Sequence, residues 1–190
     1  MQEHERLADI LFTEKASFDT VRGILEEAGI RDSITADKNL KLLAGHGAGF
    51  EAFCRIIPQV LRELADSADP DMALNNWERM VAVIRDRQTH FGLFTEKPEL
   101  LGTLLKILGT SQYLSDMLIR KPHLFPGAIS DESRHYPLPV LKEQLHVRLR
   151  DAPDYSAKLD ALRIFKQRHM LRIGARDICK AADVEEILAE

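Results

Sequence analysis

The chain has 190 residues, of which 45% are hydrophobic and 29% are charged, and its formal net charge is −4. This composition is typical of a soluble globular protein and excludes a disordered chain, and no apolar run approaches the roughly 18 residues that a membrane span needs. The acidic balance argues against nucleic acid as the main partner.

Two cysteines without a motif, Cys54 and Cys179, indicate a reducing compartment and structural thiols. The first ten residues are charged throughout, so they do not form a signal peptide. We therefore expect a cytoplasmic protein.

The first third of the chain predicts several helices joined by short loops. Ser17 or Asp19 can cap a helix over residues 18–28, and Gly29 can end it. Pro58 either kinks the next long helix or starts a second one. The expected segments are residues 6–12, 18–28, 37–44 and 50–65.

The glycines of residues 45–49 superficially resemble a phosphate-binding loop. They lack the G-x-x-x-x-G-K-[ST] pattern, and no strand is predicted before them. We interpret these residues as a loop between two helices.

Asp69-Pro70-Asp71 marks the start of another helix. Asp69 suits the N-cap, Pro70 the first helical position, and Asp71 the positive end of the helix dipole. The alternative is a Mg²⁺-binding carboxylate pair, but no third carboxylate is placed by a strand. We expect capping.

The middle of the chain continues with helices whose ends are marked by Pro, Gly and Ser. The predicted segments are a helix that runs on to Ile84, a short apolar turn over residues 91–94, a helix over 99–108 that Gly109 ends, and a helix over 112–120 that Ser111 caps.

The last third contains a linker, a helix over residues 140–149 and a long helix over residues 159–182. Leu159, Leu162 and Phe165 open an apolar stripe at helical spacing, which places Phe165 in the core together with Trp77. Residues 158–180 contain seven basic and two acidic residues. A basic ridge recurs every four residues along this helix: Arg168, Arg172, Arg176 and Lys180.

The basic ridge has two interpretations. Its side chains are either solvated and paired within the bundle, or they form a docking face for a neighbouring domain or an acidic partner.

No strand pattern is found, so the predicted fold is all-α: a multi-helix bundle of seven to nine helices that ends in a long amphipathic helix. The predicted organisation is a helical N-terminal segment (1–68), a helical subdomain (69–126), a linker (127–139) and a long-helix segment (140–190).

No catalytic or metal-ligating constellation is predicted. The seven histidines do not form H-E-x-x-H and do not pair with a cysteine at ligand spacing. No nucleophile motif of the G-x-S-x-G type is present.

Several ordered segments resemble the glutamate–ammonia-ligase adenylyltransferases, which adenylylate and deadenylylate glutamine synthetase. LRIFKQRHMLRIGARD (162–177) resembles the helix just before the family's nucleotidyltransferase core. The segments DPDMALNNWERM (69–80), LLKILGTSQYLSDMLIRKPHLF (104–125) and ADVEEILAE (182–190) resemble the surrounding regions.

The resemblance implies a helical region that leads into a catalytic half. The family's catalytic motif is Gly-Gly followed by Ser-Asp-x-Asp, whose aspartates hold Mg²⁺, and this motif is absent from the 190 residues. We therefore expect no cofactor in this chain, no catalysis by it alone, and ATP and Mg²⁺ in a catalytic half beyond Glu190. The implied partners are glutamine synthetase and the PII signal protein.

Three functional hypotheses remain open. The first is a non-catalytic helical portion of a glutamine synthetase adenylyltransferase, and the second is a stand-alone helical adaptor without catalysis. Whether the natural reading frame continues past Glu190 would separate these two. The third is a nucleic-acid binder that uses the basic ridge, which predicts salt-dependent binding.

Overall fold

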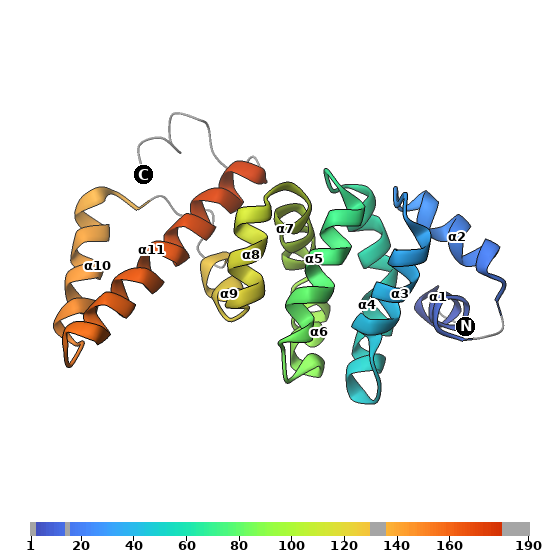
Figure 1. The fold of residues 1–190 in the computed structure, drawn as a ribbon, viewed down its shortest axis with the longest axis horizontal. Coiled ribbons are helices and arrows are strands. Elements are labelled where there is room, and N and C mark those ends of the chain that lie inside the picture. The colour runs from blue at the N-terminus through green and yellow to red at the C-terminus, as the bar shows by residue number, and fades with distance from the viewer. Residues whose placement is uncertain (1–2, 14–15, 130–135, 180–190) are drawn as a thin grey trace. The chain divides into compact units, whose positions relative to one another are not determined.

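A computed structural model of the chain describes residues 3–13, 16–129 and 136–179. This part of the chain folds into eleven helices and contains no strand, which confirms the all-α class (Figure 1). The helices are α1 (Glu3–Phe12), α2 (Phe18–Glu27), α3 (Ser33–Ala44), α4 (Ala48–Ala65), α5 (Pro70–Ala82), α6 (Arg87–Glu96), α7 (Pro98–Thr110), α8 (Gln112–Arg120), α9 (Leu124–Ile129), α10 (Leu138–Arg150) and α11 (Tyr155–Ile178).

The helices group into two compact units, unit 1 (Met1–Pro122) and unit 2 (His123–Glu190). Unit 1 contains α1 to α8, and unit 2 contains α9 to α11. The finer predicted division into residues 1–68, 69–126, 127–139 and 140–190 stays a prediction.

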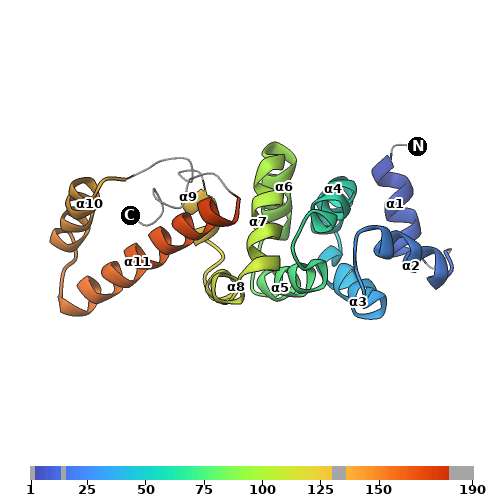
Figure 2. The same ribbon diagram turned by 90° about the horizontal axis from the view of Figure 1, so that it is seen from above.

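Unit 1 is built from two rows of helices. In one row α1 packs on α4 and α4 on α6, and in the other α2 packs on α3, α3 on α5 and α5 on α8 (Figure 2). Helix α7 contacts both rows through α4 and α5. The core of unit 1 lies between these rows.

Four aromatic side chains fill this core, and we call them the aromatic cluster: Phe53, Trp77, Phe91 and Phe94. All four are fully buried, and the rings of Phe53 and Phe91 lie 5.0 Å apart. The Trp77 ring meets the edge of Phe91 at 6.0 Å. The prediction that Trp77 anchors the core is therefore confirmed.

The helix starts that were predicted from capping residues are confirmed. The Ser17 hydroxyl accepts a hydrogen bond from the Thr20 amide at 3.3 Å. The Asp69 carboxylate accepts the Met72 amide at 2.9 Å, with Pro70 at the first helical position. These caps satisfy amides that the first turn of a helix leaves without an intrahelical acceptor.

The sequence pattern missed α6, which was predicted as a short apolar turn over residues 91–94. Asp86 caps this helix, accepting the Thr89 amide at 3.0 Å and the Thr89 hydroxyl at 2.7 Å. Only Phe91 and Phe94 of α6 are buried, so the apolar stripe is too short to reveal a ten-residue helix from periodicity. The prediction of seven to nine helices was too low, because α6 was expected as a turn and part of α9 as a linker.

Pro58 lies inside a single continuous helix, α4, so of the two predicted alternatives it does not start a second helix. Gly109 does not end α7, which runs to Thr110. Residues 127–129 of the predicted linker belong to α9, and Ala128 and Ile129 are buried.

In unit 2, α9 and α10 each pack on α11. The buried face of α11 is not the predicted one, because Leu162 is 43% exposed and Phe165 is only partly buried. Leu171 and Ala175 are buried instead, together with two arginines. The prediction of Phe165 as a core anchor was therefore wrong.

Candidate functional site

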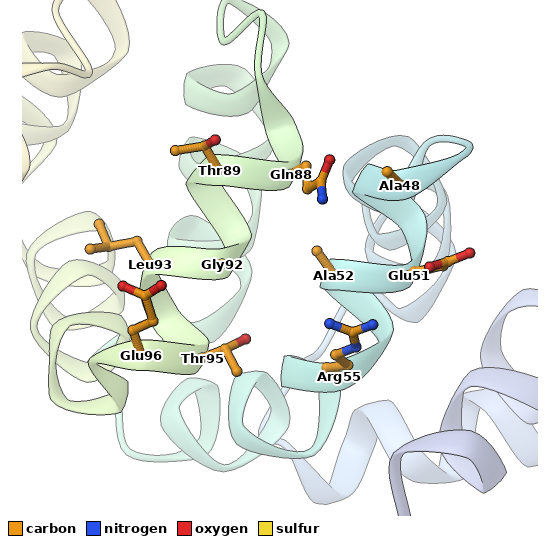
Figure 3. Close-up of a pocket in the computed structure, with 10 residues that line it drawn as sticks. All are labelled: Ala48, Glu51, Ala52, Arg55, Gln88, Thr89, Gly92, Leu93, Thr95 and Glu96. Atoms are coloured by element: carbon orange, nitrogen blue, oxygen red, sulfur yellow. The ribbon is translucent and has the colours of Figure 1, made fainter.

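A groove of about 540 Å³ runs between α4 and α6 in unit 1. Its lining includes small residues such as Ala52 and Gly92. A β-carbon added at Gly92 would meet no atom within 4 Å. Gln88 of α6 extends toward α4 at one end, and Arg55 and Thr95 approach each other at the other end (Figure 3). The ten lining residues are Ala48, Glu51, Ala52, Arg55, Gln88, Thr89, Gly92, Leu93, Thr95 and Glu96.

The α4–α6 groove offers mainly hydrogen-bonding groups. Arg55, Gln88 and Thr95 can donate hydrogen bonds to a polar ligand. Its lining has no histidine, cysteine or serine, and its carboxylates are those of Glu51 and Glu96. The sequence did not predict this groove, because α6 was not recognised.

A glycine loop connects α3 to α4, as predicted, but only residues 45–47 form it, because Ala48 and Gly49 already lie in α4. Gly45 and Gly47 both have positive φ, at 59° and 65°, which glycine adopts without strain. The Arg87 guanidinium donates to the Leu42 carbonyl at 2.7 Å near the end of α3. The loop is therefore a structural connection closed by a side chain of α6.

Asp69 and Asp71 both bind backbone amides. Asp69 caps α5, and the two carboxylate oxygens of Asp71 accept the amides of Arg31 and Asp32, each at 3.0 Å. Among the described residues no group of three or more His, Cys, Asp or Glu side chains could hold a metal ion. Asp71 thus fastens the start of α3 to α5, a role that the sequence did not reveal.

The titratable groups with shifted pKa values in the described part of the chain have structural causes. Backbone and side-chain hydrogen bonds from Thr89 lower the pKa of Asp86. Burial raises the pKa of the Cys54 thiol to about 11 and lowers the pKa of His90 to about 4. These shifts come from burial and local hydrogen bonds and do not indicate a paired acid and base.

Three of the four residues of the basic ridge lie within the described part of unit 2. Arg168 donates to the Gly127 carbonyl of α9 at 3.0 Å. Arg172 and Arg176 are 1% and 2% exposed, and the Arg172 guanidinium lies 4.8 Å from the centre of the Tyr136 ring. Lys180 lies outside the described residues.

The basic ridge is thus not a row of solvated side chains. Arg172 and Arg176 face the interior of unit 2, where burial of a charge is favourable only with compensating contacts. The predicted role of the basic ridge as a docking face stays a prediction. Arg172 and Arg176 are buried, so their side chains are not accessible to a partner at the surface of unit 2.

The profile of one protein family, glutamate-ammonia ligase adenylyltransferase, matches residues 101–190. Curated relatives described as bifunctional glutamine synthetase adenylyltransferase/adenylyl-removing enzymes are similar to the chain as well. The protein from Rhodopseudomonas palustris (strain TIE-1) is 32% identical over 133 residues, which cover 66% of this chain and 13% of the relative.

The chain belongs to the glutamate-ammonia ligase adenylyltransferase family. Two further relatives with the same description extend the similarity. The protein from Thioalkalivibrio sulfidiphilus is 29% identical over 85% of this chain and 18% of its own length. The protein from Bradyrhizobium sp. (strain BTAi1) is 30% identical over 78% of this chain and 16% of its own length.

The chain therefore spans less than a fifth of the length of these family members. The profile match begins inside α7 and includes all three helices of unit 2, whereas the α4–α6 groove lies outside it. No solved structure matches the chain significantly. No helix in the described part is long and apolar enough to cross a bilayer.

Proposed function

We propose that the chain acts as a non-catalytic helical region of a glutamine synthetase adenylyltransferase, in the cytoplasm. In this role it braces the nucleotidyltransferase half of the enzyme and contacts glutamine synthetase, with the PII signal protein as a second contact. ATP and Mg²⁺ bind to the nucleotidyltransferase half and not to this chain.

The family match without a catalytic motif carries this proposal. The chain belongs to the family, yet none of its 190 residues form the Gly-Gly and Ser-Asp-x-Asp pattern. The described residues form helices and loops and no strand, which suits a supporting region.

The catalytic part of the proposal is tested by AMP transfer. The chain is incubated with glutamine synthetase, Mg²⁺ and ATP labelled at the α-phosphate. We expect no label on glutamine synthetase, whereas a full-length relative such as the Rhodopseudomonas palustris protein labels it under the same conditions. Transfer by the chain alone would overturn the proposal.

The bracing and contact parts are tested by binding. Added in trans, the chain should raise the melting temperature of the isolated nucleotidyltransferase half of a relative, because a ligand that binds the native state stabilises it. It should also bind immobilised glutamine synthetase at concentrations up to about 100 µM. The absence of both effects would favour a stand-alone helical adaptor instead.

A further inference from the structure

Helix α10 differs from the other helices in the described part of the chain, because none of its thirteen residues is buried. Leu138 is 58% exposed, Val140 is 42% exposed and Val147 is 37% exposed. A helix of about this length is marginally stable in water unless an apolar face packs against a neighbour. Helix α10 packs on α11, and Leu138, Val140 and Val147 remain exposed to solvent among the described residues.

The exposed valines line a groove of about 620 Å³ along α10. Val140 and Val147 are separated by seven residues, so they lie two turns apart on one side of the helix. Leu141 and Leu145 project from another side and are partly buried where α10 packs on α11. The groove is lined by Pro139, Val140, Glu143, Gln144, Val147 and Arg148.

The shape of this face fits an α-helix. Apolar residues two turns apart form the ridge that a partner helix covers with its own residues at the same spacing. With Val140 and Val147 at its two ends, the groove can receive two apolar side chains that are also seven residues apart.

The net positive charge of the α10–α11 hairpin favours an acidic partner, and α10 itself carries Lys142, Arg148 and Arg150 against one acidic residue, Glu143. Residues 138–168 of the α10–α11 hairpin contain seven basic and four acidic side chains. Two exposed ion pairs, Arg150 with Asp151 and Arg163 with Asp160, each join one basic and one acidic side chain. The net positive charge of the hairpin is therefore the same with or without these pairs. A second copy of this chain would bring like charges together, whereas an acidic helix would complement them.

We propose that α10 is a docking face for an amphipathic α-helix of a partner protein, with two apolar residues seven positions apart and acidic residues flanking them. The two apolar residues cover Val140 and Val147, and the acidic flanks lie beside the basic side chains of the hairpin. This inference does not depend on the proposed function, because it follows from the exposure and charge of α10 itself.

The test uses two synthetic helical peptides of about 18 residues, a length that gives a stable helix. Both carry leucines at helical spacing, one with glutamates beside them and the other with lysines at the same positions. In fluorescence anisotropy with the full chain, the glutamate peptide should bind about tenfold more tightly than the lysine peptide. Equal affinities, or no binding by either peptide, would overturn the proposal.

Variants locate the binding on α10. Val147→Asp and Val140→Asp should each weaken binding of the glutamate peptide about tenfold, because a carboxylate enters an apolar contact beside acidic flanks. The matched control is Val83→Asp, since Val83 is an exposed valine at the end of α5, in unit 1. An equal loss with the control would contradict docking on α10.

Hydrogen exchange provides a readout that is independent of affinity. The glutamate peptide should slow amide exchange in α10 and leave α3 unchanged. If the protein forms a dimer and Val147→Asp dissociates it, a second copy of the chain covers this face. That result would overturn the proposal of a heterologous acidic helix.

Discussion

His90 is a titratable side chain in contact with the aromatic cluster. Trp77 donates its indole N–H to His90 Nε2 at 3.4 Å, and the imidazole packs beside Phe91 and Phe94 with centroids 5.4 and 5.1 Å away. Burial lowers the pKa of His90 to about 4, so the imidazole is neutral at pH 7 and can accept this hydrogen bond. The native state therefore requires the uncharged form.

The pH dependence of stability follows from this pKa. In the unfolded chain the imidazole titrates near its ordinary value of about 6.5, so between pH 6.5 and 4 the unfolded state binds more protons than the native state. The contribution of His90 to stability is full above pH 6.5 and is lost as the pH falls toward 4, by about 3 kcal/mol in total.

Urea unfolding at several pH values measures this loss. His90→Gln should flatten the dependence between pH 6.5 and 4, whereas His146→Gln, at an exposed position on α10, should leave it unchanged. A pH dependence that survives in His90→Gln would show that other groups are responsible.

Arg172 is a charged residue that unit 2 uses as a core residue. Its guanidinium is 1% exposed and lies over Tyr136, where a desolvated cation–π contact contributes about 2 kcal/mol. Arg172→Ala should therefore destabilise unit 2 by about 2 kcal/mol or more.

Arg163→Ala is the matched control for Arg172→Ala, on the same helix. Arg163 is 69% exposed and pairs with Asp160 at 3.0 Å, and the loss of such a surface pair changes stability by less than about 0.5 kcal/mol. The two variants are compared by urea unfolding and by amide exchange in α11. A similar small effect for both would mean that Arg172 is not part of the core.

At the scale of the helices, α7 packs tightly against α5 at Gly109. A β-carbon at this position would lie 2.9 Å from the Asp69 carbonyl oxygen, 3.2 Å from the Ala73 β-carbon and 3.3 Å from the Ser67 β-carbon. The nearest of these is backbone, which cannot rotate away. The absence of a side chain at Gly109 is therefore what allows α7 to continue past it against α5.

Gly109→Ala should destabilise unit 1 by about 1–3 kcal/mol, because α5 and α7 must separate to admit the methyl group. Gly92→Ala in α6 is the control, since a β-carbon there meets no atom within 4 Å. Alanine is the better helix former, so this variant should gain up to about 1 kcal/mol. Chemical denaturation of both variants gives the comparison, and a loss in Gly92→Ala equal to that in Gly109→Ala would contradict the packing argument.

At the scale of the whole molecule, unit 1 is a compact unit with its own buried core. Unit 1 holds the aromatic cluster, and Leu25, Leu43 and Leu64 add fully buried leucines to the same unit. A domain with its own apolar core can fold alone.

We therefore expect residues 1–122, produced alone, to fold. The segment should show a helical circular dichroism spectrum and a single sigmoidal unfolding transition, as small single domains do. A gradual loss of signal with denaturant, without a transition, would show that unit 1 depends on unit 2.

Family membership belongs to this scale as well. Three of the four segments that resembled the adenylyltransferases, residues 104–125, 162–177 and 182–190, fall within the matched range of 101–190, and residues 69–80 lie outside it. The family resemblance could be recognised from the sequence, because it depends on the order of residues along the chain. The surface of each unit could not be predicted from the sequence, since it depends on how the helices pack.

The sequence by itself determined the helical class and the helix starts that carry a recognised capping residue. Ser17, Asp69 and Ser111 cap the helices that follow them, because a cap is a contact with an amide only three residues away. Periodicity also located Trp77 in the core, because the apolar residues of α5 recur at helical spacing along one face and Trp77 is one of them.

Only the tertiary structure decided which face of α11 is buried, how α4 and α6 form a groove, and what Asp71 binds. Each depends on residues far away in the chain: Arg168 on Gly127, Arg172 on Tyr136, and Asp71 on the amides of residues 31 and 32. A basic side chain looks solvated in a sequence because its charge favours water, and only the stacking aromatic ring and the neighbouring helix show why it is buried.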